Sequence, residues 1–187
     1  MGKDRGSLME VHMVSRCQQL VFIHSIATLM LAGATVAPAV TWDDVGFTTA
    51  SSLPQYVWDA LDKGAKDYSV SSHLNPFYLQ GDFDGDGSRD TAVLIKHKKS
   101  LHVGAAIVFK GGKVRIFGAG RDMGEGESDF DWMDAWFVEP KGAVEQGASD
   151  EAPPKLRGDA IMVLKTESAS RLIYWDGKGF RWHQQGD

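Results

Sequence analysis

The sequence predicts an α+β fold in which an N-terminal helix packs on a meandering antiparallel sheet of about seven strands. Three observations lead to this prediction: a stretch in which apolar residues recur at helical spacing, short runs rich in Val, Ile and Phe after it, and glycine-containing connections short enough to close hairpins. The chain has 187 residues, of which 43% are hydrophobic and 24% are charged, and this is the composition of a globular domain.

The expected helix covers about residues 54–67. Ser51 and Ser52 can cap its start, and Pro54 suits its first turn because proline lacks the N–H that the first turn leaves unpaired. Its apolar positions follow three- and four-residue steps and are expected to face the sheet. They are Leu53, Val57, Trp58, Leu61 and Ala65.

The expected strands are short apolar runs separated by Gly and Asp. Gly111-Gly112 is a connection of the kind that closes a hairpin, and so is the stretch 176–179, which makes neighbouring strands antiparallel. Residues 141–158 are rich in Gly, Ala, Glu and Pro and are expected to form a surface loop. The apolar runs cover residues 77–80, 91–97, 103–110, 113–117, 135–138, 160–165, 172–175 and 180–183.

The start of the chain has the order of a secretory signal peptide. Residues 20–36 are nearly all apolar, follow Arg16 and run into Ala37-Pro38-Ala39. We therefore expect a signal peptide over residues 1–39 and a single globular domain over residues 40–187, exported to the periplasm or the cell exterior. The apolar stretch is shorter than the roughly 20 residues of a membrane helix, so no stable membrane span is expected after cleavage.

Charge and cysteine content narrow the class of protein further. The only cysteine, Cys17, lies in the leader, so the exported domain has no disulfide and must gain stability from its core or from a bound metal. The net charge of −5 argues against a nucleic-acid-binding surface. A start at Met13 is an alternative that would make residues 1–12 a gene-model extension.

One stretch carries the spacing of a calcium-binding loop. Counted from Asp82, carboxylates stand at positions 1, 3, 5 and 9, a glycine at position 6 permits a sharp turn, and position 7 offers its carbonyl oxygen. Four carboxylates so close together repel one another unless a cation lies among them. The predicted Ca²⁺ ligands are Asp82, Asp84, Asp86, Ser88 and Asp90.

The loop differs from an EF-hand because position 12 is Val93 where a bidentate Glu is needed, and because its flanks look like strands. It resembles the single calcium loop of FG-GAP propeller repeats, Asp-x-Asp-x-Asp-Gly-x-x-Asp, over residues 81–95. One copy cannot close a propeller, so the resemblance implies only the loop and its calcium. With residues 131–134 and the tail at 174–177, the wider chain resembles small exported bacterial proteins to which no activity is assigned.

A second acidic stretch, residues 122–134, contains no Lys or Arg. It can form a second cation site, a face that binds a protein or glycan, or a solvated loop whose tryptophans turn inward to the core, and we favour the solvated loop. The candidate partner-binding residues are Asp129, Asp131, Trp132, Asp134 and Trp136.

The leading hypothesis for function is an exported, calcium-stabilised, non-enzymatic domain of the cell envelope that binds a protein or glycan. One alternative is a periplasmic inhibitor or immunity protein that blocks a basic enzyme with its acidic stretch. Another is a small hydrolase with paired carboxylates drawn from Asp129, Asp131 and Asp134. No catalytic residue is assigned, because the sequence has neither a zinc-binding His-Glu-x-x-His motif nor a nucleophile elbow.

Overall fold

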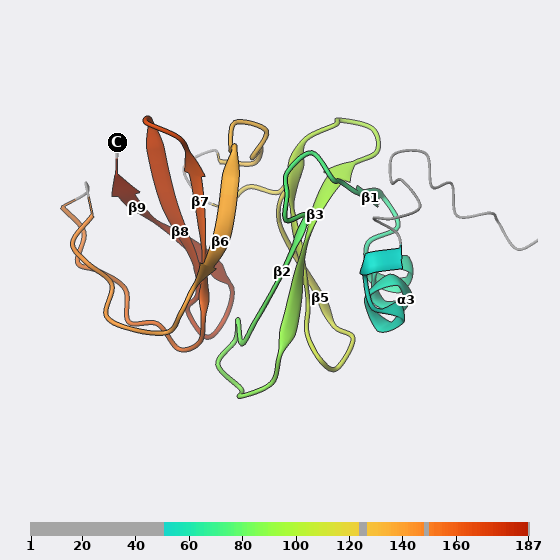
Figure 1. The fold of residues 1–187 in the computed structure, drawn as a ribbon, viewed down its shortest axis with the longest axis horizontal. Coiled ribbons are helices and arrows are strands. Elements are labelled where there is room, and N and C mark those ends of the chain that lie inside the picture. The colour runs from blue at the N-terminus through green and yellow to red at the C-terminus, as the bar shows by residue number, and fades with distance from the viewer. Residues whose placement is uncertain (1–50, 124–126, 148–149, 187) are drawn as a thin grey trace, which may run out of the picture. The chain divides into compact units, whose positions relative to one another are not determined.

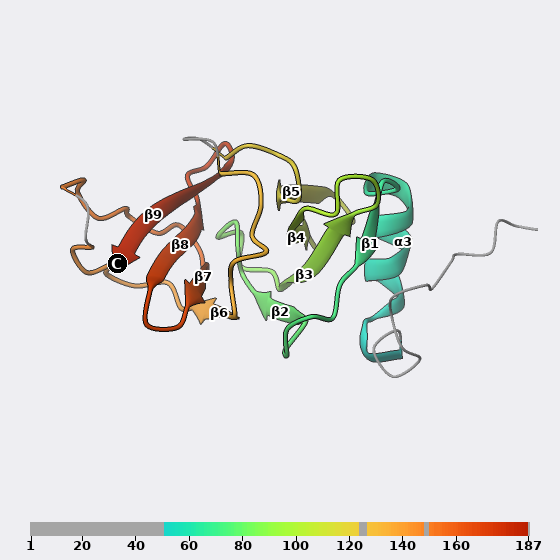
Figure 2. The ribbon, with the colours of Figure 1, turned by 90° about the horizontal axis from the view of Figure 1, so that it is seen from above.

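The computed structural model describes residues 51–123, 127–147 and 150–186, so the expected signal peptide lies outside the described residues. All of the described residues belong to one compact unit. They contain the helix α3 (Gln55–Gly64) and nine strands in two antiparallel sheets (Figures 1 and 2).

The first sheet has five strands, in which β3 and β4 are central. The order is β1-β3-β4-β5, and β2 pairs with the part of β3 that β1 leaves uncovered, because β1 pairs with residues 95–97 and β2 with residues 90–93. The strands are β1 (Tyr68–Val70), β2 (Tyr78–Gly81), β3 (Asp90–His97), β4 (Val103–Val108) and β5 (Val114–Gly118).

The second sheet has four strands paired in chain order. The hairpin predicted at residues 176–179 joins β8 to β9, and the one predicted at Gly111-Gly112 joins β4 to β5 in the first sheet, so both hairpins are confirmed. No helix or strand occurs in the described part of 141–158, as expected for a loop. The strands are β6 (Ala135–Glu139), β7 (Ala160–Lys165), β8 (Ala169–Trp175) and β9 (Phe180–Gly186).

The prediction of a single sheet of about seven strands is therefore wrong, although the α+β class holds broadly. The reason is that all residues of β4 and the first six residues of β3 are buried. Because side chains alternate along a strand, both faces of the sheet are buried there. A sheet that is apolar on both faces needs a cover on each side. Figure 1 shows α3 on one side of the first sheet and the second sheet on the other.

The helix α3 lies within the expected range 54–67 and covers one face of the first sheet. Val57, Ala60 and Leu61 are buried in one cluster with Val93 and Ala106 of the central strands. The expected caps are corrected: Pro54 takes the N-cap position without a side-chain cap bond, and its carbonyl accepts the N–H of Val57 at 3.0 Å. None of the described helices is both long enough and apolar enough to cross a membrane.

The other face of the first sheet forms the larger core with the second sheet. Leu94 and Ile107 from the first sheet pack in one cluster with Ile161 and Ile173 from the second. Phe130, in the connection between the sheets, is fully buried in the same cluster, and its ring lies 5.7 Å from that of Phe117.

Replacing Phe130 by Ala should lower the free energy of unfolding by about 3–5 kcal/mol, because the cavity left between the sheets cannot close fully. The matched control is Phe137→Ala, since Phe137 is 43% exposed and its loss should change stability by only about 0.5 kcal/mol. Urea unfolding of the two variants checks this. Similar losses in both would contradict the placement of Phe130 in the core.

Candidate metal centre

The three acidic residues at positions 1, 3 and 5 of the predicted loop lie together between β2 and β3. Asp82, Asp84 and Asp86 each offer a carboxylate oxygen, and these oxygens all lie within 4.8 Å of one another. Among the described residues, no Lys or Arg forms an ion pair with any of the three. Their charges are therefore balanced by no side chain of the described part, and a cation would relieve their repulsion.

Backbone N–H groups hold these carboxylates in place. Asp82 accepts the N–H of Gly85 at 2.9 Å and that of Gly87 at 3.0 Å, one with each carboxylate oxygen. Asp84 accepts the N–H of Asp86 at 3.2 Å. Gly85 and Gly87 have φ of 78° and 85°, a region that glycine enters without steric cost. Because an ionised carboxylate oxygen accepts more than one bond, each group keeps capacity for a metal.

Asp90, the predicted ligand at position 9, lies outside this group of three. Its side chain is buried at the start of β3, where it accepts the N–H of Phe83 and that of Lys110, each at 3.1 Å. Burial raises the pKa of Asp90 to about 6, the two N–H bonds act against this, and the charges of Asp84 and Asp86 add to it. Asp90 therefore ties the loop to the neighbouring strand end.

Ser88, the predicted ligand at position 7, stays close to the group through its backbone. Its N–H donates to Asp86 at 2.7 Å, and its side chain is half-buried. The predicted ligand contributes its carbonyl oxygen, so the identity of the side chain matters little here.

A second segment, residues 157–159, forms part of the same site and was missed by the sequence analysis. The N–H of Asp82 donates to the Asp159 carboxylate at 2.9 Å, and the N–H of Asp159 donates to the carbonyl of Asp82 at 2.7 Å. Asp159 also accepts the N–H of Lys141 at 3.0 Å. These bonds join the first sheet to the residue before β7, 77 positions later in the sequence. No local sequence pattern predicts a contact over such a distance.

Two glycines allow this close approach. A Cβ atom on Gly158 would overlap the carbonyl oxygen of Asp82 and lie 2.6 Å from the nitrogen of Gly85. A Cβ atom on Gly85 would overlap the carbonyl oxygen of Arg157. The guanidinium of Arg157 in turn covers Gly177, where a Cβ would lie 2.9 Å from its Cζ. The segment 157–159 thus contacts the carboxylate loop on one side and the β8–β9 turn on the other.

Of the two tryptophans considered with the acidic stretch, Trp136 turns inward and Trp132 does so in part. Trp136 is 3% exposed and its Nε1 donates to the carbonyl of Pro76 at 2.6 Å, so it cannot present its ring to a partner. Trp132 is half-buried, with its Nε1 bonded to Glu127 at 3.0 Å. The guanidinium of Arg171 lies 5.1 Å from the ring centre of Trp132.

Two of the three candidate carboxylates of this stretch hold backbone in place. Asp129 accepts the N–H of Val103 at 2.8 Å, and Asp134 accepts both the N–H and the hydroxyl of Thr166 at 3.0 Å. Asp131 is exposed. Residues 129–134 therefore largely connect the two sheets and hold their backbones in place.

The chain was compared with protein-family models, curated proteins and solved structures, and none of the three comparisons gave a match.

Replacing Gly158 by Ala should lower the free energy of unfolding by about 1–3 kcal/mol, because the new methyl group separates the two backbones that meet there. Gly111→Ala is the matched control, since a Cβ on Gly111 would have no atom within 4 Å. Chemical denaturation measures both variants. A loss at Gly158 no larger than that at Gly111 would show that the contact carries no stability.

Proposed function

We propose that Asp82, Asp84 and Asp86 bind one calcium ion and that this ion stabilises the fold. We further propose that the protein is a non-enzymatic domain of the cell envelope. The observation that carries the proposal is the group of three carboxylate oxygens within 4.8 Å of one another. The carbonyl of Ser88 and water complete the ligand set. Asp90 supports the loop from the core side through its bonds to Phe83 and Lys110.

The chemistry of the donors favours calcium over other metals. All of them are hard oxygen ligands, which suit Ca²⁺ and Mg²⁺ better than Zn²⁺. Among the described residues, neither His nor Cys belongs to the cluster. Magnesium demands a nearly ideal octahedron, whereas calcium accepts six to eight ligands in flexible geometry. The spacing 1, 3, 5 with glycine at 6, shared with FG-GAP loops, supports the same choice.

The proposed ion has a structural consequence beyond the loop. Asp82 belongs to the carboxylate group, and it is also bonded to the backbone N–H and to the carboxylate of Asp159. An ion that orders the loop would therefore also order the residue before β7. A ligand present at about 100 times its dissociation constant stabilises a fold by roughly 2.7 kcal/mol. In a domain without disulfides, that is a large share of the total stability.

Export and partner binding form the second half of the proposal. The leader at residues 1–39 supports a location outside the cytoplasm, where weak calcium loops with dissociation constants near 10⁻⁴–10⁻³ M are usual. A protein or glycan is the proposed partner. In the acidic stretch it can reach the exposed Asp131 and the half-buried Trp132, but not Trp136.

Asp84→Asn tests the calcium site, because Asn keeps the oxygen that accepts the N–H of Asp86 and loses the charge. In chelator the variant should be as stable as the wild type or more stable, since repulsion is relieved. In calcium it should be less stable, with affinity lowered about tenfold or more. Calorimetric titration and thermal unfolding of the full chain, each with calcium, magnesium and EDTA, measure this.

The matched control is Asp131→Asn, which removes an exposed carboxylate outside the loop and should leave calcium affinity unchanged. Wild-type protein that melts at the same temperature in calcium and in EDTA, with no heat of binding, would refute the site.

A further inference from the structure

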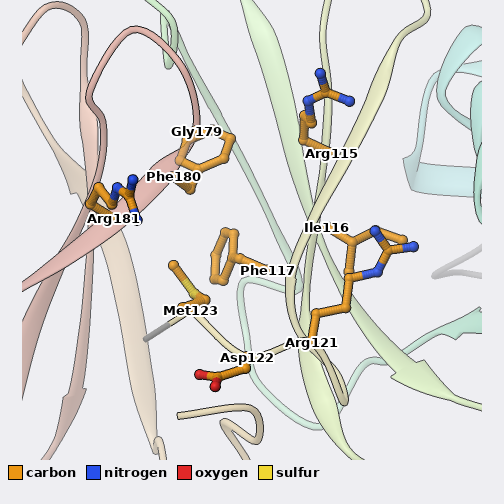
Figure 3. A pocket seen from close by; sticks show the side chains of 9 residues that line it. All are labelled: Arg115, Ile116, Phe117, Arg121, Asp122, Met123, Gly179, Phe180 and Arg181. Atoms are coloured by element: carbon orange, nitrogen blue, oxygen red, sulfur yellow. The ribbon is translucent and has the colours of Figure 1, made fainter. Parts of the chain in front are cut away.

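A cavity of about 370 Å³ lies between β5 of the first sheet and the start of β9 in the second (Figure 3). Three of its lining side chains are arginines, Arg115, Arg121 and Arg181, and one is an acid, Asp122. In a chain with a net charge of −5, this is a local excess of positive charge. Its volume lies near the lower end of the range of small-molecule sites.

The floor of the cavity is a fixed aromatic cluster. The ring of Phe180 lies 5.9 Å from that of Phe117 and 5.1 Å from that of Trp175, and it stacks at 11° to the ring of Phe109. Figure 3 shows Phe117, Phe180 and Met123 in the middle of the site, with Arg115 and Arg181 on its two sides. A flat apolar group would therefore find a preformed surface.

One of the flanking guanidinium groups is held in place. Arg181 donates from Nε to Asp176 at 2.9 Å. Asp176 is kept ionised, because the N–H of Gly179, then Arg181 and then the N–H of Lys178 lower its pKa to about 2. The carboxylate thus anchors both the turn and the arginine on one side of the cavity.

The other two arginines differ in how they are bound. Arg115 is exposed, and its guanidinium forms no hydrogen bond or ion pair with the described residues. Arg121 donates from Nε to the hydroxyl of Tyr68 at 3.2 Å, and its guanidinium lies 5.9 Å from the centre of that ring. Arg115 is therefore the group most available to a ligand.

We propose that this cavity binds a small amphipathic anion, a flat apolar ring that carries one carboxylate, sulfate or phosphate group. The ring lies on Phe180 and Met123, above the ring of Phe117, which is 3% exposed, and the oxyanion meets Arg115, with Arg181 opposite. Guanidinium groups suit this role because their planar fork matches two oxygens at once. This site is separate from the carboxylate loop and does not depend on calcium binding there.

The probe is 2-naphthoate, titrated into the ¹⁵N-labelled full chain and followed by amide chemical shifts. Saturable shifts are expected at Phe117, Met123, Gly179 and Phe180. The neutral analogue 2-naphthylmethanol should bind about tenfold more weakly or worse, because it cannot pair with a guanidinium. Inorganic phosphate should also bind more weakly, because it lacks the ring.

Arg115→Glu should weaken 2-naphthoate binding about tenfold or more, since it turns an attraction into a repulsion. The matched control is Lys99→Glu, an equal change of charge at an exposed turn residue outside the cavity, which should leave the affinity unchanged. The proposal would be overturned if the neutral analogue bound as tightly as 2-naphthoate, or if phosphate did. It would also be overturned if Arg115→Glu left the affinity unchanged, or if the shifts were confined to residues outside the cavity.

Discussion

The burial of both faces of β3 and β4 is the constraint on which the rest of the structure depends. Their side chains alternate between two apolar clusters, so Leu94 faces the second sheet while Val93 and Ile95 face α3. Neither the helix nor the second sheet alone could remove all of this surface from water. The three-layer arrangement follows, and with it the positions of the connections that carry the candidate sites.

The carboxylate loop is a consequence of this layering, because it stands where β2 turns into β3 and meets the entry to the second sheet. Asp159 holds Asp82 through its own backbone N–H and through its carboxylate, where the absence of a side chain on Gly158 lets the two backbones meet. These bonds fix the loop from the second sheet, while Asp90 fixes it from the core of the first. A cation at Asp82 would therefore act on the junction between the two sheets as well as on a turn. Such a role suits a domain that has no disulfide to constrain it.

The arginine-lined cavity shares structural support with this loop. Arg157 touches Gly85 through its carbonyl and Gly177 through its guanidinium, and Gly177 belongs to the turn that presents Phe180 and Arg181 to the cavity. The two sites thus lie at different ends of one series of contacts and carry opposite charge. The packing that joins the two sheets thus places the acidic cluster and the arginine group at separate positions of the domain.

By itself the sequence determined the features that depend on residues close together in the chain: the helix near 54–67, the two glycine hairpins, and the carboxylates two positions apart at Asp82, Asp84 and Asp86. Only the tertiary structure decided that the strands form two sheets, that Asp90 and Trp136 turn inward, and that residues 157–159 meet the loop. Local patterns fix turns and periodicity, whereas burial depends on which faces meet across many residues. Strands β3 and β4 are buried on both faces, a feature that the predicted arrangement of one helix on a single sheet did not include.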